Sequence, residues 1–301
     1  MRITQSVLIS NFLRNYNNNL GRMDELNIQL ATGSKINKPS DDPAGIVTSL
    51  RLRTKLRQNE QFQKNVGDAI SWVERADSAL NTYDEVIHRV RELVVKASNG
   101  SNDESSLKAI SDEIKQLKEE IADVANTSLD DRYIFGGTHT MQQVYNAASG
   151  EWEGNTEPIN YETGENILMQ VNLDGSVFGI DFSGDTPDTS NSIFATIDKI
   201  VTDLENGNYD ELGSTDLALL DDHMNNVLSY RSEVGAKYNR LELINNRLAD
   251  METSYQKVLS TNEDVDMAQL IIELTNQENV YRASLAAGAK IIQPSLADFL
   301  S

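Results

Sequence analysis

Apolar residues recur at alternating steps of four and three near both ends of this chain. Near the N-terminus the spacing runs through Ile9, Leu13, Tyr16, Leu20, Met23, Asn27 and Leu30. Near the C-terminus it runs through Met267, Ile271, Leu274, Glu278, Tyr281, Leu285, Gly288 and Ile292. This alternation is the seam of a coiled coil, in which each helix lays one narrow stripe against a neighbour. The pattern predicts two terminal helices, and neither can bury its stripe against itself.

The middle of the chain carries the same period in four more segments. The spacing predicts helices over residues 62–97, 107–124, 193–204 and 217–259. Asn99-Gly100 suits the left-handed end of the first helix, and Ser101 with Glu104 predicts a capping box for the second. So short a connection favours an antiparallel hairpin of these two helices. Ser214 is the predicted cap of the longest helix.

Residues 138–188 lose the helical period and become rich in glycine and asparagine. Short β-type runs at 167–171 and 177–180 flank Asp174-Gly175, a pair that predicts a hairpin turn. We therefore expect a small β domain, inserted between two stretches of helix.

The expected fold is mainly α: an elongated antiparallel helical bundle, or coiled coil, formed by the N- and C-terminal halves, with the β domain at its tip. The expected division is nested. Residues 1–40 with 264–301 form a terminal coiled-coil assembly domain, 41–137 with 189–263 a helical rod domain, and 138–188 the inserted β domain.

The terminal helices need partners to be stable. An isolated helix of this length is only marginally stable in water without tertiary packing. Burying an apolar side chain stabilises a fold by about 1.5–3 kcal/mol, but only when a partner covers it. We expect residues 1–40 and 264–301 to be poorly ordered in the monomer and to fold when several copies of the chain assemble.

Composition narrows the class of protein. The chain has 301 residues, of which 39% are hydrophobic, and no run approaches the roughly 18 apolar residues that span a bilayer, so we expect no membrane insertion. The N-terminus lacks the uninterrupted apolar core of a cleaved secretory signal, so the protein stays in the cytosol or leaves by another route. The absence of cysteine excludes disulfides, thiolate nucleophiles and Cys-ligated metals.

The net charge of −21 argues against a nucleic-acid partner, because such a field repels phosphate backbones. Its distribution is uneven. Residues 1–60 carry nine Lys/Arg against five Asp/Glu, whereas residues 136–190 carry nine acidic residues and no Lys or Arg. The cluster from Arg51 to Arg57 is the one basic patch, and we expect it to meet acidic faces of other copies.

Nothing in the sequence indicates an enzyme, and we predict no catalytic, cofactor or metal site. The histidines stand apart in sequence: His88, His139 and His223. The acidic residues Asp181, Asp185 and Asp188 lack the spacing of a calcium loop. A phosphate-binding loop and a Gly-x-Ser-x-Gly elbow are both missing. We interpret Trp72 and Trp152 as packing residues.

Two distant motifs resemble those of the flagellin superfamily. The N-terminal motif is Leu30-Ala31-Thr32-Gly33-Ser34-Lys35-Ile36-Asn37 with Asp41-Asp42-Pro43-Ala44-Gly45, and residues 267–300 resemble the matching C-terminal helix. Within the superfamily, residues 131–138 (Asp-Arg-Tyr-Ile-Phe-Gly-Gly-Thr) and the ending 289–300 are similar to the hook–filament junction proteins, the hook-associated protein 3 family.

These motifs also have a physical interpretation of their own. Asp42 suits the N-cap and Pro43 the first position of a helix, while Gly33 permits a bend, so we predict a joint at residues 31–43. The second motif ends the helical body and turns the chain into the β domain. Its residues are Arg132, Tyr133, Phe135, Gly136 and Gly137.

The resemblance implies a structural role in the bacterial flagellum. It implies an uncleaved N-terminal export signal, type III export from the cytoplasm, an export chaperone on the C-terminal helix, and an extracellular place at the hook–filament junction. Its partners there would be copies of itself, the first hook-associated protein on the hook side and flagellin on the filament side. The terminal helices would line the axial core, with the β domain outward.

Two rival interpretations remain. The chain could be a flagellin, a filament subunit, although the Gln-rich, Pro-Gln type ending of flagellin is absent. From another class, it could be an acidic coiled-coil effector or scaffold exported by a virulence-type system. Self-polymerisation into long filaments would favour flagellin.

Overall fold

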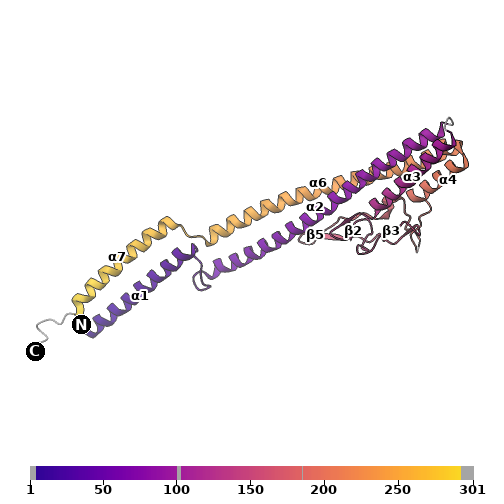
Figure 1. The fold of residues 1–301 in the computed structure, drawn as a ribbon. Coiled ribbons are helices and arrows are strands. Elements are labelled where there is room, and N and C mark those ends of the chain that lie inside the picture. The colour runs from indigo at the N-terminus through magenta and orange to yellow at the C-terminus, as the bar shows by residue number, and fades with distance from the viewer. Residues whose placement is uncertain (1–4, 100–102, 185, 293–301) are drawn as a thin grey trace, which may run out of the picture. The chain divides into compact units, whose positions relative to one another are not determined.

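The computed structural model describes residues 5–99, 103–184 and 186–292, and these are mainly helical (Figure 1). The helices are α1 (Gln5–Thr32), α2 (Pro43–Ser98), α3 (Glu104–Ala125), α4 (Ile193–Asn206), α5 (Tyr209–Glu211), α6 (Leu217–Glu263) and α7 (Met267–Ile292). A 3-10 turn η1 (Gly175–Phe178) and a π-turn η2 (Leu212–Asp216) complete the helical elements. The mainly α fold with a small strand-containing insert is confirmed.

The chain forms two compact units. The terminal unit comprises Met1–Gln58 with Met251–Ser301, of which residues 5–58 and 251–292 are described; the body unit comprises Asn59–Asp250. Both boundaries fall inside long helices, α2 and α6. Because the contacts join the strand segment to the helices in a single unit, the expected three-domain division stays a prediction.

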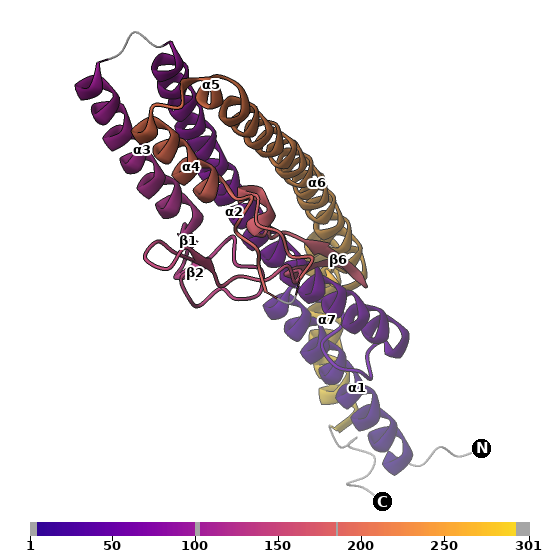
Figure 2. The same ribbon diagram turned by 90° about the vertical axis from the view of Figure 1, so that its right-hand side faces the viewer.

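The body unit contains α3, α4 and the strands together with most of α2 and α6 (Figure 2). A continuous hydrophobic core lies between these helices and strands. The predicted ladder of α2 is confirmed, since these members are buried: Val66, Ala69, Val73, Ala76, Leu80, Tyr83, Ile87, Val90, Val94 and Ala97. From α6, every seventh residue enters the same core: Leu220, Val227, Val234, Leu241 and Leu248. The 4-3 spacing thus places one face of each helix inward, as a coiled-coil pattern requires.

Two predicted helix starts are wrong. The N-cap of α3 is Asp103, whose carboxylate accepts a hydrogen bond from the backbone N–H of Ser106; Ser101 lies outside the described residues. Ser214 lies within η2, because the chain is already helical from Tyr209 onward. At α3 a second capping residue, Asp103, competes with the predicted one, since Asp caps as well as Ser does. Asn208, before α5, makes no side-chain capping bond.

The strand segment consists of three two-stranded antiparallel hairpins. They are β1 (Ser128–Leu129) with β2 (Arg132–Tyr133), β3 (Tyr145–Asn146) with β4 (Glu151–Trp152), and β5 (Asn160–Gly164) with β6 (Ile167–Gln170). The predicted hairpin at Asp174-Gly175 is wrong. Asp174 instead caps η1 by accepting from the N–H of Ser176, and the turn before β6 uses Asn166 at φ 59°.

An aromatic cluster fastens the strand segment to the helices. The ring of Phe178 in η1 lies 4.8 Å from that of Tyr83 in α2, 5.1 Å from that of Phe135 and 5.7 Å from that of Trp152, measured between centroids. Nearer the start of α2, the Asn65 amide donates to the carbonyl of Glu162 at 2.8 Å. The segment therefore lies along the side of the helices rather than at the tip, and Trp152 is a packing residue as expected.

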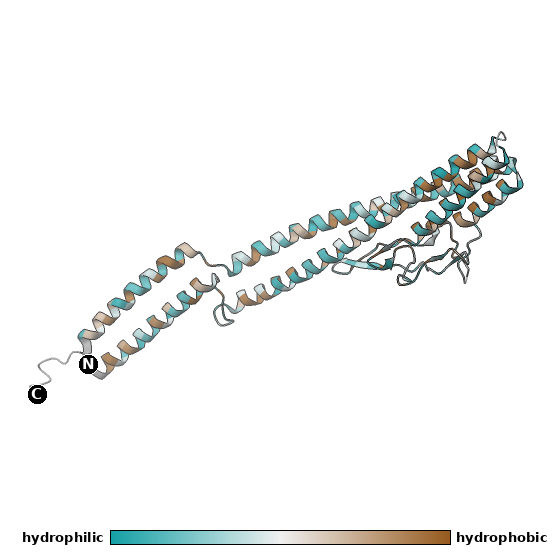
Figure 3. Ribbon diagram, in the orientation of Figure 1, coloured by the Kyte–Doolittle hydropathy of each residue, from teal (hydrophilic) through white to brown (hydrophobic). Residues whose placement is uncertain are grey.

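Hydrophilic and hydrophobic residues alternate along the helices (Figure 3). Within the described part of the chain, no helix is apolar over a length that would cross a membrane. Buried hydrophobic side chains are concentrated in the body unit. The described residues of the terminal unit add only Ile36, Leu52 and Leu270 to them.

Candidate assembly surface and joint

Helices α1 and α7 form an antiparallel pair in the terminal unit (Figure 1). The hydroxyl groups of Tyr16 and Tyr281 are 3.0 Å apart, and their ring centroids are 5.5 Å apart. The Asn19 amide donates to the Ser284 hydroxyl at 3.1 Å. The Gln277 amide donates to the backbone carbonyl of Asn19 at 3.0 Å. These directional contacts fix the register of the pair.

A notch at Gly288 receives the ring of Phe12. A Cβ atom on Gly288 would lie only 2.2 Å from the Cζ atom of Phe12, so any larger side chain collides with the ring. Gly288 is buried and Phe12 is partly buried. A glycine thus allows close approach of the two helices at one defined level.

The stripes that face each other keep the 4-3 spacing. In α1 the partly buried residues with this spacing are Ile9, Phe12, Tyr16, Asn19, Met23, Leu26 and Leu30. In α7 the buried or partly buried residues are Leu270, Leu274, Gln277, Tyr281, Ser284 and Gly288. Every other residue from 267 to 290 is exposed. The contact stripe thus follows the coiled-coil period on both helices.

The structure brings only some of the predicted seam residues into this pair. Those at the contact or partly buried are Ile9, Tyr16, Met23, Leu30, Leu274 and Tyr281. Those left exposed are Leu13, Leu20, Asn27, Met267, Ile271 and Leu285. The side chain of Ile292 lies outside the described part. The exposed members occupy an adjacent stripe, and their role in contacts with other copies stays a prediction.

That adjacent stripe carries several exposed apolar side chains. The side chains of Leu13 and Leu20 in α1 are 50% and 42% exposed. In α7, Ile271 is 51% and Leu285 44% exposed. Scattered exposed leucines are ordinary, but contiguous apolar stripes on monomers mark interaction surfaces. In the part of the chain that the structure describes, the pair therefore has one covered face and one uncovered apolar stripe.

The helical path is interrupted twice, once between α1 and α2 and once between α6 and α7. The two interruptions are hydrogen-bonded to each other. Helix α1 ends where Gly33 takes φ +70°, with its N–H bonded to the carbonyl of Gln29 at 2.8 Å. Lys35 N–H then donates to the carbonyl of Glu263 at 2.7 Å, and Val265 N–H donates to the carbonyl of Gly33 at 3.0 Å. A bend at one break therefore strains the other.

Side chains close this joint. Glu263 is buried and forms an ion pair of 2.8 Å with Arg53, whose side chain is 59% exposed. The Asn262 amide donates to the carbonyl of Gly45 at 2.9 Å and to the Ser49 hydroxyl at 2.6 Å. Neither Asn262 nor Glu263 was found from the sequence. In the sequence, Asn262 and Glu263 look like ordinary polar residues at an exposed helix end. Only their contacts with residues 33–53, far away in the sequence, distinguish them from such residues.

The N-terminus of α2 is capped as predicted. The Asp42 carboxylate accepts from the N–H groups of Ala44 at 3.1 Å and Gly45 at 2.9 Å, and Pro43 is the first residue of α2. Beside it, hydrogen bonds from the backbone N–H groups of Lys38 and Asn37 lower the pKa of Asp41. The loop between the helices is therefore ordered by two carboxylates in succession.

The second predicted motif lies in the body unit. Asp130 and Asp131 both take positive φ, 48° and 62°, in the two-residue turn between β1 and β2. Arg132 is exposed and Tyr133 half-buried, while Phe135 is fully buried in the aromatic cluster.

The two glycines of this motif fit tight positions. Gly137 has φ +64°, and a Cβ atom there would lie 2.1 Å from the carbonyl oxygen of Asn155. At Gly136 a Cβ atom would lie 2.5 Å from the carbonyl oxygen of His139. The motif therefore builds the turn from the helices into the strand segment.

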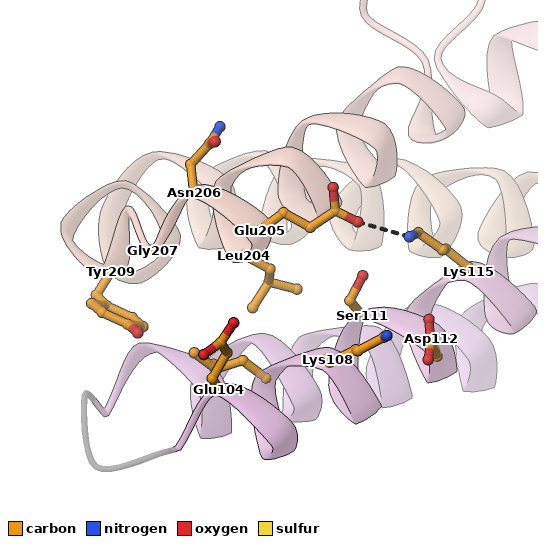
Figure 4. Close-up of a pocket in the computed structure, with 11 residues that line it drawn as sticks. Glu104, Lys108, Ser111, Asp112, Lys115, Leu204, Glu205, Asn206, Gly207 and Tyr209 are labelled. Carbon is orange, nitrogen blue, oxygen red and sulfur yellow. Dashed lines mark hydrogen bonds and ion pairs between the residues drawn. The ribbon is translucent and has the colours of Figure 1, made fainter.

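A groove of about 480 Å³ lies between α3 and α4 in the body unit (Figure 4). Lys115 crosses it to Glu205 with a distance of 2.8 Å between nitrogen and oxygen. Its walls mix charges of both signs with Leu107 and Leu204. Because its charges are paired or open to solvent, the groove resembles a solvated helix interface rather than a ligand site.

The buried histidine is structural. His223 lies 3.2 Å from the Thr196 hydroxyl, and burial lowers the pKa of its imidazole, against the opposing charge of Asp222. Among the described residues, no group of three or more His, Asp or Glu side chains is placed to hold a metal ion.

The similarity to known proteins extends over nearly the whole chain. Residues 3–140 match the bacterial flagellin N-terminal helical region, and residues 217–300 match the bacterial flagellin C-terminal helical region. A flagellin of Bacillus subtilis is 30% identical over 97% of both chains. The flagellar hook-associated protein 3 of Escherichia coli is 25% identical over 95% of this chain and 96% of that protein. A solved structure from Vibrio parahaemolyticus, described as a flagellar hook-associated protein, has a TM-score of 0.67 at 22% identity, covering 74% of this chain and 100% of that one.

Proposed function

This chain belongs to the flagellin family and is a structural component of the bacterial flagellum, and from this premise we propose that it is the adaptor that joins the hook to the flagellin filament. The observation that carries the proposal is the uncovered apolar stripe beside the satisfied face of the α1–α7 pair. A pair of helices with one satisfied face and one open face suits a subunit that is surrounded by its neighbours.

The magnitudes favour contact with several neighbours rather than one. Burying one exposed Leu or Ile contributes about 1.5–3 kcal/mol, and the stripe offers several of them in each subunit. Association costs at least about 4 kcal/mol in lost translational and rotational freedom, besides the ordering of side chains. Copies that surround each other on both sides bury the exposed apolar side chains of both helices.

The proposed partners follow from the motif at residues 131–138 and the ending at 289–300. They are further copies of the chain, the first hook-associated protein on the hook side and flagellin on the filament side. An export chaperone would cover α7 in the cytoplasm, and the chain would leave through the type III pathway with its N-terminus uncleaved. The ending lies partly outside the described residues, so its support comes from the sequence.

A filament subunit is the second candidate, because the Bacillus subtilis flagellin is 30% identical over nearly the full length. Both candidates share self-assembly through α1 and α7, and they differ in the number of copies assembled. The expected rival from another class, an exported effector or scaffold, has no support once the chain belongs to the flagellin family.

A deletion strain separates the two candidates. Loss of an adaptor leaves flagellin secreted into the medium but not retained on the cell. Loss of a filament subunit instead removes the filament protein itself from both places. Immunoblots of flagellin in medium and sheared-cell fractions, with the gene restored in trans as the control, give the answer. Long filaments grown from purified chain on seeds would contradict the adaptor function.

A further inference from the structure

One face of α2 near its N-terminus is both apolar and basic and stays open. Val47 is 64% exposed and Leu50 58% exposed, and Arg51 and Arg57 are exposed beside them. Steps of three and four residues put Val47, Leu50 and Arg51 on one side of a helix. The opposite side packs inward, since Ser49 and Leu52 are buried. No acidic residue occurs anywhere from 43 to 59.

Among the described residues, Arg51 and Arg57 of this face have no carboxylate partner. Within the described residues, Arg51 makes no hydrogen bond or ion pair. Arg57 reaches only the hydroxyl of Thr54, at 3.4 Å. Arg53, on the inward edge, is different because it pairs with Glu263 at 2.8 Å. Arg53, which pairs within its own chain, thus lies on a different side of α2 from Arg51.

The strand segment shows the opposite pattern. Residues 136–190 hold nine acidic residues and no Lys or Arg. Among them Glu151, Glu153, Glu162 and Glu165 are exposed, and none forms an ion pair within the described residues. The chain therefore has two stretches of unlike charge: residues 43–59 contain no acidic residue, and residues 136–190 contain no Lys or Arg.

Copies of a chain with a net charge of −21 repel each other when they approach. Complementary patches remove that repulsion locally, orient the encounter and reject wrong registers. We propose that the Val47–Leu50–Arg51–Arg57 face of α2 docks on the acidic strand segment of a second copy, with the two apolar side chains covered at its centre. This inference rests on the proposed self-assembly and adds a contact outside the α1–α7 pair.

Charge reversal tests the face. Arg51→Glu with Arg57→Glu is expressed in the deletion strain, and the amount of chain in isolated flagella is divided by the amount secreted. We expect this ratio to fall at least about tenfold, the low end of what electrostatic steering contributes. The matched control is Arg240→Glu with Arg247→Glu, which changes the net charge equally at two exposed arginines of α6. We expect the control to change the ratio by less than about twofold.

The cysteine-free chain allows the contact to be located. Arg51→Cys provides a single thiol for a photoreactive cross-linker in assembled flagella, and mass spectrometry identifies the attached peptide. A peptide from residues 136–190 of a second copy supports the proposal. Attachment to another part of a copy, to another protein or to the same chain overturns it.

The outcomes also separate this inference from the proposed function. If wild-type chain is secreted but never found in flagella, the proposed function fails. If wild type is incorporated and the charge-reversed variant is incorporated equally well, only the docking face is wrong. Equal losses in the test and control variants point to net charge alone and overturn the face as well.

Discussion

The terminal unit and the body unit share the same heptad pattern, but they cover their apolar stripes differently. The body unit covers its apolar stripes within one chain, through a continuous core and an aromatic cluster around Phe178. In the terminal unit, polar and steric contacts select one register for α1 and α7, while Leu13, Leu20, Ile271 and Leu285 stay open. A periodic apolar pattern thus predicts that a stripe will be covered, but does not say by which chain.

The difference gives each unit a separate task. Directional contacts such as the Tyr16–Tyr281 hydroxyl pair contribute only about 1 kcal/mol each, so they specify the pairing without making it very stable. The body unit supplies the stability. A chain built in this way can leave its ends adaptable until neighbours arrive.

The first test compares one leucine in each unit. Leu80 in α2 is completely buried, whereas Leu20 in α1 is 42% exposed. We expect Leu80→Ala to lower the free energy of unfolding by about 2–5 kcal/mol, through lost burial and a residual cavity. Leu20→Ala should change it by less than about 0.5 kcal/mol. Urea denaturation followed by circular dichroism measures both, and similar losses would contradict the contrast between the units.

The second test addresses the notch in α7. Gly288→Val places carbon atoms where the ring of Phe12 lies, and overpacking of this kind costs about 1–3 kcal/mol. The loss should be confined to the α1–α7 pair, so amide hydrogen exchange should rise in both helices and stay unchanged around Leu80.

The double variant Phe12→Ala with Gly288→Val is the control for this notch. Removing the ring relieves the collision, so the double variant should recover most of the protection of α1 and α7. Failure to recover would mean that glycine at this position serves helix flexibility rather than close packing.

The sequence predicted the helices well and their contact stripes only in part. Long 4-3 ladders identified α2 and α6, because apolar periodicity over many turns has few alternatives. In α1 and α7, two adjacent stripes both satisfy the pattern. The aliphatic residues Leu13 and Leu20 favoured one, whereas Phe12 and Asn19 form the actual contact. Shape and hydrogen-bond complementarity between distant segments made that choice, and neither can be read from one helix.

At the joint, too, the sequence predicted the residues whose roles are local and missed those whose partners are distant. Gly33, Asp42 and Pro43 were predicted because their roles are local: a positive φ, a cap and a first helical turn. Asn262 and Glu263 were missed because their partners are more than two hundred positions away in the sequence. Likewise Asp174-Gly175 has the local signal of a hairpin, but a buried Phe178 draws the chain into a 3-10 turn instead.

The third test loosens the joint. Asn262→Ala leaves the carbonyl of Gly45 and the hydroxyl of Ser49 without their donor, which should cost about 1 kcal/mol. Hydrogen exchange should rise at residues 33–49 and 261–266, and flagella should contain less of the chain for the amount secreted. The control is Asn225→Ala, an exposed position of the same helix. Unchanged exchange at the joint would show that the backbone bonds between the two breaks suffice alone.

The last test has the smallest effect on the isolated chain and separates the two stripes of α7. Ile271→Asp changes a side chain that is 51% exposed, so the free energy of unfolding should move by less than about 0.5 kcal/mol. Leu274→Asp changes the partly buried stripe that faces α1 and should loosen the pair itself. Both variants should be secreted yet absent from flagella, but only Leu274→Asp should raise hydrogen exchange in α1 before assembly. If Ile271→Asp enters flagella normally, the uncovered stripe is not the surface that neighbouring copies cover, and the pairing of α1 with α7 would be the whole function of the terminal heptads.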